Sequence, residues 1–85
     1  MTSVIMYSTG YCPYCTKARK LLDKKGIDYI DMRVDIQTEL RDEMIQRSGR
    51  HTVPQIFING QAIGGCEDLY ALEQEGKLDT LLRGK

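Results

Sequence analysis

The residues of this chain best suited to chemistry are two cysteines held two residues apart, in Cys12-Pro13-Tyr14-Cys15. Two thiols at this spacing can exchange with a substrate disulfide, close into a disulfide of their own, or supply half of a zinc site. Zinc needs more soft ligands, and the spacing of His51 and Cys66 matches no common zinc module. The pattern therefore favours thiol–disulfide exchange over a metal site or a structural disulfide.

The dithiol stands where a predicted strand gives way to a predicted helix. Val4-Ile5-Met6-Tyr7 is a short apolar run followed by Ser-Thr-Gly, which is typical of a buried central strand. Apolar positions 14, 18, 21 and 22 then recur at helical spacing, with Pro13 in the first turn and Gly26 at the stop. This predicts a helix over about 13–25.

Strand-to-helix placement is the setting of a thioredoxin-like redox motif. Cys12 would lie at the positive N-terminal end of the helix, where the thiolate, the nucleophilic form, is favoured over the thiol. Cys15, one turn further, faces inward and suits a resolving thiol that attacks a mixed disulfide formed on Cys12. The helix also carries Lys17, Arg19 and Lys20 and has no acid before Asp23, which adds a weaker stabilisation of the thiolate.

Two other residues have ordinary explanations beside the chemical ones. His51 is interpreted as a solvated loop residue rather than a ligand. Cys66 is interpreted as a small buried hydrophobe at a helix start, and a slow third redox thiol is the alternative.

Further elements follow the same rules of periodicity. Residues 29–35 alternate, which predicts a half-buried strand with Ile30, Met32 and Val34 on its core face. Thr38 is placed to cap a helix that ends at Gly49. Apolar segments 55–58 and 61–63 flank Asn59-Gly60, the signature of a hairpin with a type I′ turn. A last helix begins near 65–66 and ends at Gly76, and a final short turn carries Leu78, Leu81 and Leu82.

This order of elements predicts an α/β fold in one domain, residues 1–85. A right-handed parallel crossover comes first and an antiparallel hairpin completes the sheet, giving a mixed four-stranded sheet flanked by three or more helices. Twelve basic residues balance twelve acidic ones, which gives no support to a nucleic-acid or membrane-surface role. No apolar run approaches the ~20 residues that span a bilayer. We expect a monomer in the cytoplasm that binds neither nucleic acid nor membrane.

Three segments together resemble the dithiol glutaredoxins, above all the small bacterial ones. They are Cys12-Pro13-Tyr14-Cys15, Thr52-Val53-Pro54 and Gly64-Gly65-Cys66-Glu67-Asp68. Each is weak alone, but the combination at these separations is specific, and the likeness covers essentially the whole chain. The resemblance implies a thioredoxin fold, a cis peptide at Pro54 opposite the dithiol, and a glutathione-dependent thiol–disulfide oxidoreductase that uses glutathione as co-substrate and no metal.

The resemblance also implies a glutathione groove, made from two walls. Val53 would pair its backbone with the tripeptide, Thr52 would line the same wall, Pro54 would hold that edge open, and Tyr14 would pack beside the bound sulfur. On the other wall, the helix that follows Gly65 would hold the γ-glutamyl carboxylate with the N–H groups of Cys66 and Glu67.

Two charged residues complete the implied groove. Asp68 would pair with the α-amino group of glutathione, and Arg41 would meet the glycine carboxylate. Both have plainer explanations, since Asp68 is a favourable acid in a first helical turn and Arg41 is an ordinary solvated charge. One departure matters: many relatives have a lysine three residues before the first cysteine, where this chain has Thr9, so one cation that would stabilise the thiolate is missing.

The mechanism implied by the resemblance has two branches. Cys12 attacks a mixed disulfide of glutathione, or it opens a protein disulfide that Cys15 then resolves. The expected partners are glutathione and glutathionylated or disulfide-containing proteins, among which the family suggests ribonucleotide reductase. Two alternatives stay open: a reductant served by a thioredoxin-type flavoprotein reductase, and a protein sharing an iron–sulfur cluster between two subunits, against which Pro13 argues by restricting the loop.

Overall fold

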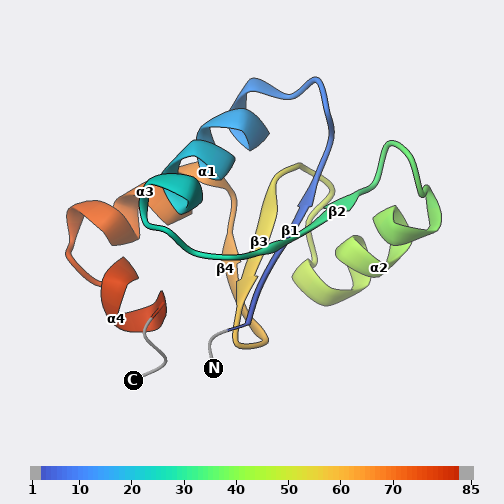
Figure 1. The fold of residues 1–85 in the computed structure, drawn as a ribbon. Helices are drawn as coiled ribbons and strands as arrows, with labels where there is room; N and C mark the ends of the chain where they lie inside the picture. The colour runs from blue at the N-terminus through green and yellow to red at the C-terminus, as the bar shows by residue number, and fades with distance from the viewer. Residues whose placement is uncertain (1–2, 83–85) are drawn as a thin grey trace.

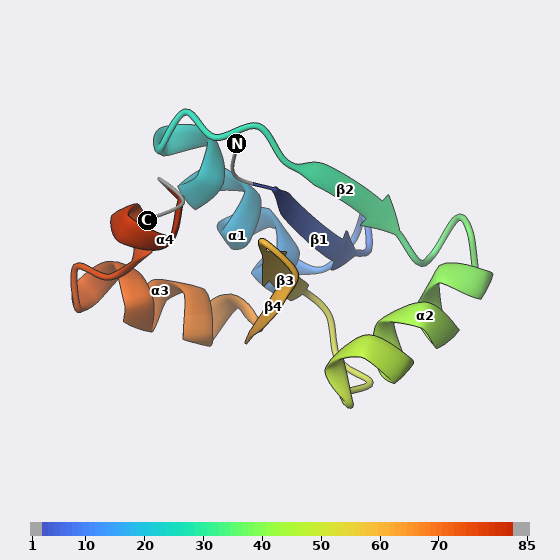
Figure 2. The same cartoon turned by 90° about the horizontal axis from the view of Figure 1, so that it is seen from below.

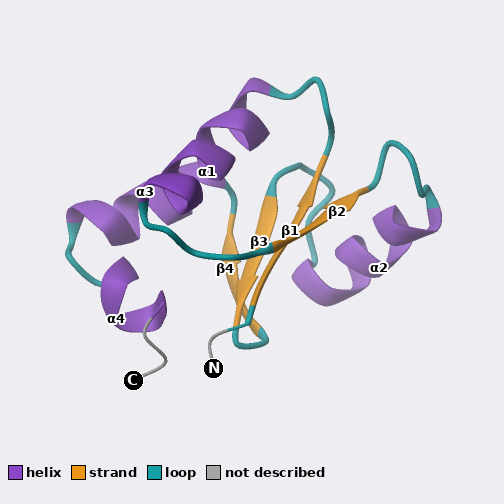
Figure 3. Cartoon of the chain, in the orientation of Figure 1, coloured by secondary structure: helices purple, strands orange, loops and turns teal. Residues whose placement is uncertain are grey.

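The computed structural model describes residues 3–82 and arranges them around one mixed sheet (Figure 1). Strand β1 pairs in parallel with β2 and antiparallel with β3, and β3 pairs antiparallel with β4, in the order β2-β1-β3-β4 (Figure 3). This confirms the mixed four-stranded sheet. The elements are β1 (Val4–Ser8), α1 (Pro13–Lys24), β2 (Ile30–Arg33), α2 (Glu39–Ser48), β3 (Gln55–Ile58), β4 (Gln61–Gly64), α3 (Cys66–Gln74) and α4 (Leu78–Leu82).

Alternation along the central strands divides the core between the two faces of the sheet. Val4 and Met6 of β1 join the core under α1, α3 and α4, whereas Tyr7 joins the core under α2. Figure 2 shows α1, α3 and α4 on one side of the sheet and α2 alone on the other. The two central strands, β1 and β3, are therefore buried, whereas the edge strands β2 and β4 are partly exposed. The loop that follows the C-terminal end of β1 leads to the dithiol.

One burial prediction is wrong. Residues 29–35 form a strand only over Ile30–Arg33, and Ile30 is 57% exposed. β2 is the edge of the sheet, and α2 covers only its C-terminal end (Figure 2). Met32 and Val34 therefore pack beside α2 as predicted, while Ile30, on the same face, lies beyond the reach of that helix.

The predicted ends of the other elements agree with the structure within two residues. Gly49 ends α2 with φ 72°, and Asn59 and Gly60 turn the hairpin with φ 52° and 81°, both positive as a type I′ turn requires. The last long helix ends at Gln74 rather than at Gly76. The final turn is a short helix, α4, whose Leu78 and Leu82 are buried.

Candidate active site

The dithiol lies at the N-terminus of α1, as the sequence predicts. Cys12 is the N-cap residue with extended backbone (φ −89°, ψ 120°), Pro13 follows it, and the Thr16 N–H donates to the Cys12 carbonyl at 3.1 Å. The Cys12 side chain is partly exposed, and Cys15 is fully buried. Burial raises the pKa of Cys15 to about 11, opposed by a hydrogen bond from the Thr9 backbone. Cys15 is therefore a thiol at neutral pH, and Cys12 is the sulfur that a substrate can reach.

The segment that follows α2 faces the exposed sulfur. The Cys12 thiol donates a weak hydrogen bond to the carbonyl of Val53, with Sγ and O 3.8 Å apart. The Val53–Pro54 peptide bond is cis. The nucleophile thus stands against the edge that the resemblance assigns to a bound tripeptide.

A groove of about 310 Å³ opens at Val53, the residue whose carbonyl faces the Cys12 sulfur; we call it the first groove. It brings together residues from α1, the segment before β3 and the start of α3. Its lining is Tyr14, Arg50, Thr52, Val53, Pro54, Gly65, Cys66, Glu67 and Asp68. Every residue predicted to bind glutathione is in this lining except Arg41, and Arg50 is present although the sequence did not single it out.

The start of α3 forms the second wall of the first groove. The Gly65 N–H donates to Asp68 Oδ2 at 2.9 Å, so Asp68 closes back on the first turn of its own helix. Gly64 makes this possible, because its φ is 116° and a Cβ there would overlap the Asp68 carboxylate. The N–H groups of the first turn have no partner within the helix and carry its positive end, which makes this wall suitable for an anion.

Comparison with known proteins decides the family. A glutaredoxin profile matches residues 4–63. Glutaredoxin 3 of Escherichia coli (strain K12) is 52% identical over 83 residues, which cover 98% of this chain and 100% of that protein. The solution structure of a glutaredoxin from Brucella melitensis matches with a TM-score of 0.86 and 53% identity, over 100% of this chain and 94% of that one.

The chain belongs to the glutaredoxin family. Members of this family are glutathione-dependent oxidoreductases, and their fold is the thioredoxin fold, so the fold and the enzyme class predicted from sequence are confirmed. A buckwheat glutaredoxin–glutathione complex also matches, with a TM-score of 0.90 and 31% identity, over 98% of this chain and 78% of that one.

Residues 3–82 contain neither a candidate metal site nor a helix that could span a membrane. No group of three or more His, Cys, Asp or Glu side chains in that range is placed to hold a metal ion. None of the helices there has the length and apolar character needed to cross a membrane.

Two arginines lie near the first groove, and the contact of Arg41 with the glycine carboxylate of glutathione stays a prediction. Arg41 lies outside the lining of the first groove and donates to the carbonyl of His51 at 3.2 Å, so it supports the loop before Thr52. Arg50 lies inside, where Nη1 is 3.2 Å from Asp68 Oδ2. Sequence reasoning overlooked Arg50 because nothing local distinguishes it from the arginines nearby; only the fold brings it to Asp68.

The positions of Cys66 and His51 agree with the ordinary explanations predicted for them. Cys66 is 6% exposed at the start of α3, and burial raises the pKa of its thiol. It is thus a buried residue that borders the first groove. His51 is exposed, as a solvated loop residue should be.

The backbone that leads from β1 to the nucleophile is held from one side by α1. Arg19 donates from Nη2 to Ser8 Oγ at 2.7 Å and to the Thr9 carbonyl at 3.2 Å. Its Nε is 2.8 Å from Asp31 Oδ2, and the Ser8 hydroxyl donates to the same carboxylate. Arg19 lies one turn after Cys15 on the same helix, so it is a cation near the buried thiol, and its charge partly opposes the rise in the pKa of Cys15 that burial causes.

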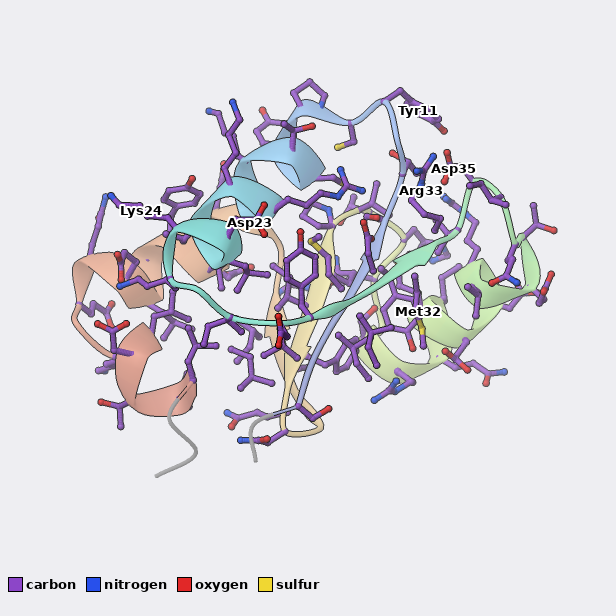
Figure 4. All side chains as sticks on the ribbon, viewed as in Figure 1. Tyr11, Asp23, Lys24, Met32, Arg33 and Asp35 are labelled. Atoms are coloured by element: carbon purple, nitrogen blue, oxygen red, sulfur yellow. The ribbon has the colours of Figure 1, made fainter. Side chains whose placement is uncertain are left out.

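A second ion pair, Arg33–Asp35, holds Gly10, the residue that follows Thr9. Arg33 makes two contacts with Asp35, 2.7 Å to Oδ1 and 2.6 Å to Oδ2. The Gly10 N–H donates to Asp35 Oδ2 at 3.2 Å, and Arg33 lies so close to Gly10 that a Cβ there would overlap its guanidinium. Figure 4 shows Arg33 and Asp35 beside the loop that leads to α1.

We call these two pairs, Arg19–Asp31 and Arg33–Asp35, the loop clasp. It surrounds Thr9, which is 3% exposed and occupies the position where many glutaredoxins have lysine. The buried Thr9 hydroxyl has no hydrogen-bond partner among the described residues. In this chain the cations that contact the loop, Arg19 and Arg33, come from α1 and β2.

Proposed function

We propose that this chain is a glutathione-dependent thiol–disulfide oxidoreductase in which Cys12 is the nucleophile and Cys15 the resolving thiol. The observation that carries the proposal is the position of Cys12, at the N-terminus of α1 with its sulfur against Val53 at the edge of the first groove. A helix N-terminus favours the thiolate, and the adjoining groove can hold a tripeptide beside it.

The two walls of the first groove can bind two parts of glutathione, its cysteinyl residue and its γ-glutamyl residue. Val53 offers backbone groups for a short β-like pairing with the cysteinyl residue. The first turn of α3, at Cys66 and Glu67, offers N–H groups to the γ-glutamyl carboxylate. Thr52, Pro54 and Tyr14 line the space between these walls.

The reaction conserves electrons through two disulfide exchanges. The Cys12 thiolate attacks the glutathione sulfur of a mixed disulfide; the bond between that sulfur and the target thiol breaks, and the target leaves as a thiolate that takes a proton. The thiolate of a second glutathione then attacks the glutathione sulfur on Cys12 and releases oxidised glutathione. With a protein disulfide, Cys15 attacks the Cys12 mixed disulfide instead, and glutathione later reduces the Cys12–Cys15 bond.

Asp68 has a partner to exchange when glutathione binds. Its carboxylate contacts Arg50, and the two side chains are 47% and 55% exposed. Exposed pairs of this kind contribute only about 0–1 kcal/mol, so the α-amino group of glutathione can replace the guanidinium at little cost. Arg50→Gln should then leave glutathione binding nearly unchanged, whereas Asp68→Asn should weaken it; titration calorimetry with glutathione on the Cys15→Ser variant measures both.

The substrates that we propose are glutathionylated and disulfide-containing proteins, and ribonucleotide reductase stays a prediction among them. We also propose that the protein is a single-domain monomer that works in the cytoplasm. The alternatives are a reductant served by thioredoxin reductase and a carrier of a shared iron–sulfur cluster. Turnover with thioredoxin reductase in place of glutathione would favour the first, and a coloured protein after anaerobic reconstitution would favour the second.

The testing experiment is reduction of hydroxyethyl disulfide by glutathione, coupled to glutathione reductase and NADPH. The wild type and Cys15→Ser should both be active and Cys12→Ser inactive, because Cys12 alone performs the glutathione branch. Cys66→Ser, the matched control, should keep both branches. Reduction of a protein disulfide should be lost in Cys15→Ser; loss of both activities in that variant contradicts the scheme with two branches.

A further inference from the structure

A second groove opens beside the first, between the N-terminal turns of α1 and α3. Its volume is about 420 Å³, and its lining is Tyr14, Lys17, Cys66, Glu67 and Tyr70. Tyr14, Cys66 and Glu67 line the first groove as well, so the two grooves adjoin and share these three residues as a wall. Lys17 and Tyr70 belong to the second groove alone.

Helical spacing explains why these side chains converge. Tyr14 and Lys17 are three residues apart, and Cys66 and Tyr70 four, so each pair lies on one face of its helix. The Tyr70 hydroxyl donates to the Lys17 carbonyl at 3.1 Å, which joins α3 to α1 at this point, and the Tyr70 ring packs against the buried core. The second groove is therefore shaped by the contact between α1 and α3.

The proposed reaction needs a place for a second molecule next to bound glutathione. In a displacement at sulfur the leaving sulfur stands opposite the attacking one, so the departing chain begins beside the glutathione and cannot share the first groove. The second groove adjoins the first through Tyr14, the residue that the proposed function places beside the bound sulfur. Another cavity, which includes Ser3 and Ile30, lies at the opposite end of β1 from the dithiol and cannot serve.

The chemistry of the second groove indicates its occupant. Tyr14 is 53% exposed and Tyr70 partly buried, so two aromatic rings offer contact to an apolar side chain. Lys17 forms no ion pair with any residue in the range 3–82, and α1 has no acid in its first turn. An acidic residue of a partner would meet Lys17 there, while Glu67 would repel it from the α3 side and so orient it along α1.

We propose that the second groove holds the polypeptide of a glutathionylated protein substrate, with an apolar residue beside its cysteine and an acidic residue against Lys17. The inference rests on the proposed glutathione chemistry of the first groove. It makes Lys17 and Tyr70 determinants of which protein thiols are released, whereas small disulfides, which do not reach this groove, react independently of them.

Two short synthetic peptides test the proposal. Each contains a glutathionylated cysteine next to phenylalanine, and they differ only in having glutamate or lysine two positions further along. The full-length wild type should prefer the glutamate peptide in kcat/KM, and Lys17→Glu should shift that preference by about three- to tenfold toward the lysine peptide. Lys20→Glu, an equal charge change at an exposed position of α1 outside both grooves, should leave the preference within about twofold of wild type.

Reduction of hydroxyethyl disulfide separates this inference from the proposed function. With that small substrate, Lys17→Glu should change kcat and KM no more than Lys20→Glu does, because both variants make the same charge change on α1. An unchanged peptide preference in Lys17→Glu, an equal shift in Lys20→Glu, or a parallel loss with hydroxyethyl disulfide would each overturn the docking proposal. Inactivity of the wild type with hydroxyethyl disulfide and glutathione would instead overturn the proposed function.

Discussion

The two faces of the sheet are built differently. The face under α1, α3 and α4 has a core of ten buried side chains among the described residues, all aliphatic, alanine or methionine. The face under α2 has four, two of them the aromatic residues Tyr7 and Phe57. There the buried Tyr7 hydroxyl donates to Glu43 at 2.5 Å and accepts from Arg47 at 2.7 Å, and Arg47 lies over the Phe57 ring at 4.5 Å.

Burial therefore fixes some parts of the site, and polar contacts fix others. The two helix N-termini, at Cys12 and Cys66, stand on helices anchored in the larger core. The segment 50–54 follows α2, whose attachment to the sheet depends on a smaller core and on the hydrogen bonds of Tyr7. We therefore expect stability to depend most on the first face and the shape of the first groove most on the second.

The largest expected effect comes from the larger core. Leu22 is fully buried there, so Leu22→Ala should lower the free energy of unfolding by about 2–5 kcal/mol. Chemical denaturation measures it, with Lys20→Ala on the exposed side of α1 as the control. A loss no greater than that of the control would mean that the α1 face is not the main source of stability.

The α2 face should respond more in binding than in stability. Tyr7→Phe removes a hydroxyl that joins the sheet to Glu43 and Arg47, at a cost of about 1–2 kcal/mol. Because α2 leads directly into 50–54, KM for glutathione should rise while kcat falls less. Equal KM values for Tyr7→Phe and wild type in the hydroxyethyl disulfide assay would contradict the claim that the α2 face determines the shape of the first groove.

The Arg33–Asp35 pair of the loop clasp should break in acid. Arg33 and the Gly10 N–H hold the pKa of Asp35 well below its usual range. A depressed folded pKa stabilises the protein above the unfolded value, about 3.9, and this contribution is lost as the pH falls further. Asp35→Asn should therefore lower the melting temperature at neutral pH and much less in strong acid. A constant difference across the acid range would show that the pair does not titrate with folding.

The smallest effect is expected from Lys25, on the side of the sheet that α1, α3 and α4 cover. Lys25 joins α1 to Glu73 of α3 and Asp79 of α4, at 2.7 Å and 2.9 Å, and these hydrogen bonds raise its pKa. A raised folded pKa stabilises the protein below the ordinary lysine value and ceases to do so as the pH rises through the folded value. Lys25→Met should lower the melting temperature slightly at neutral pH, and the difference should shrink in alkali; a difference that persists there would contradict this.

The dithiol's place at a helix start and the order of elements could be predicted from local signals: helix punctuation, alternation and an Asn-Gly turn. The two walls of the first groove were implied only by the resemblance to glutaredoxins, because no local signal shows that segments 52–54 and 64–68 meet. Sequence reasoning failed where long-range placement decides. Ile30 was assigned to the core because alternation cannot reveal that a strand lies at an edge. Arg50 and the loop clasp were missed because Arg19 reaches Asp31, and Gly10 reaches Asp35, only after the sheet has formed.

The central claim is that Cys12 accepts glutathione in the first groove, and trapping that intermediate tests it most directly. Cys15→Ser, treated with oxidised glutathione, should gain one glutathionyl group on Cys12 by peptide mass spectrometry. Its NMR amide signals should shift chiefly at Val53, Cys66 and Glu67. Modification of Cys66 in place of Cys12, or a Cys12 adduct whose amide shifts avoid both walls of the first groove, would contradict the account.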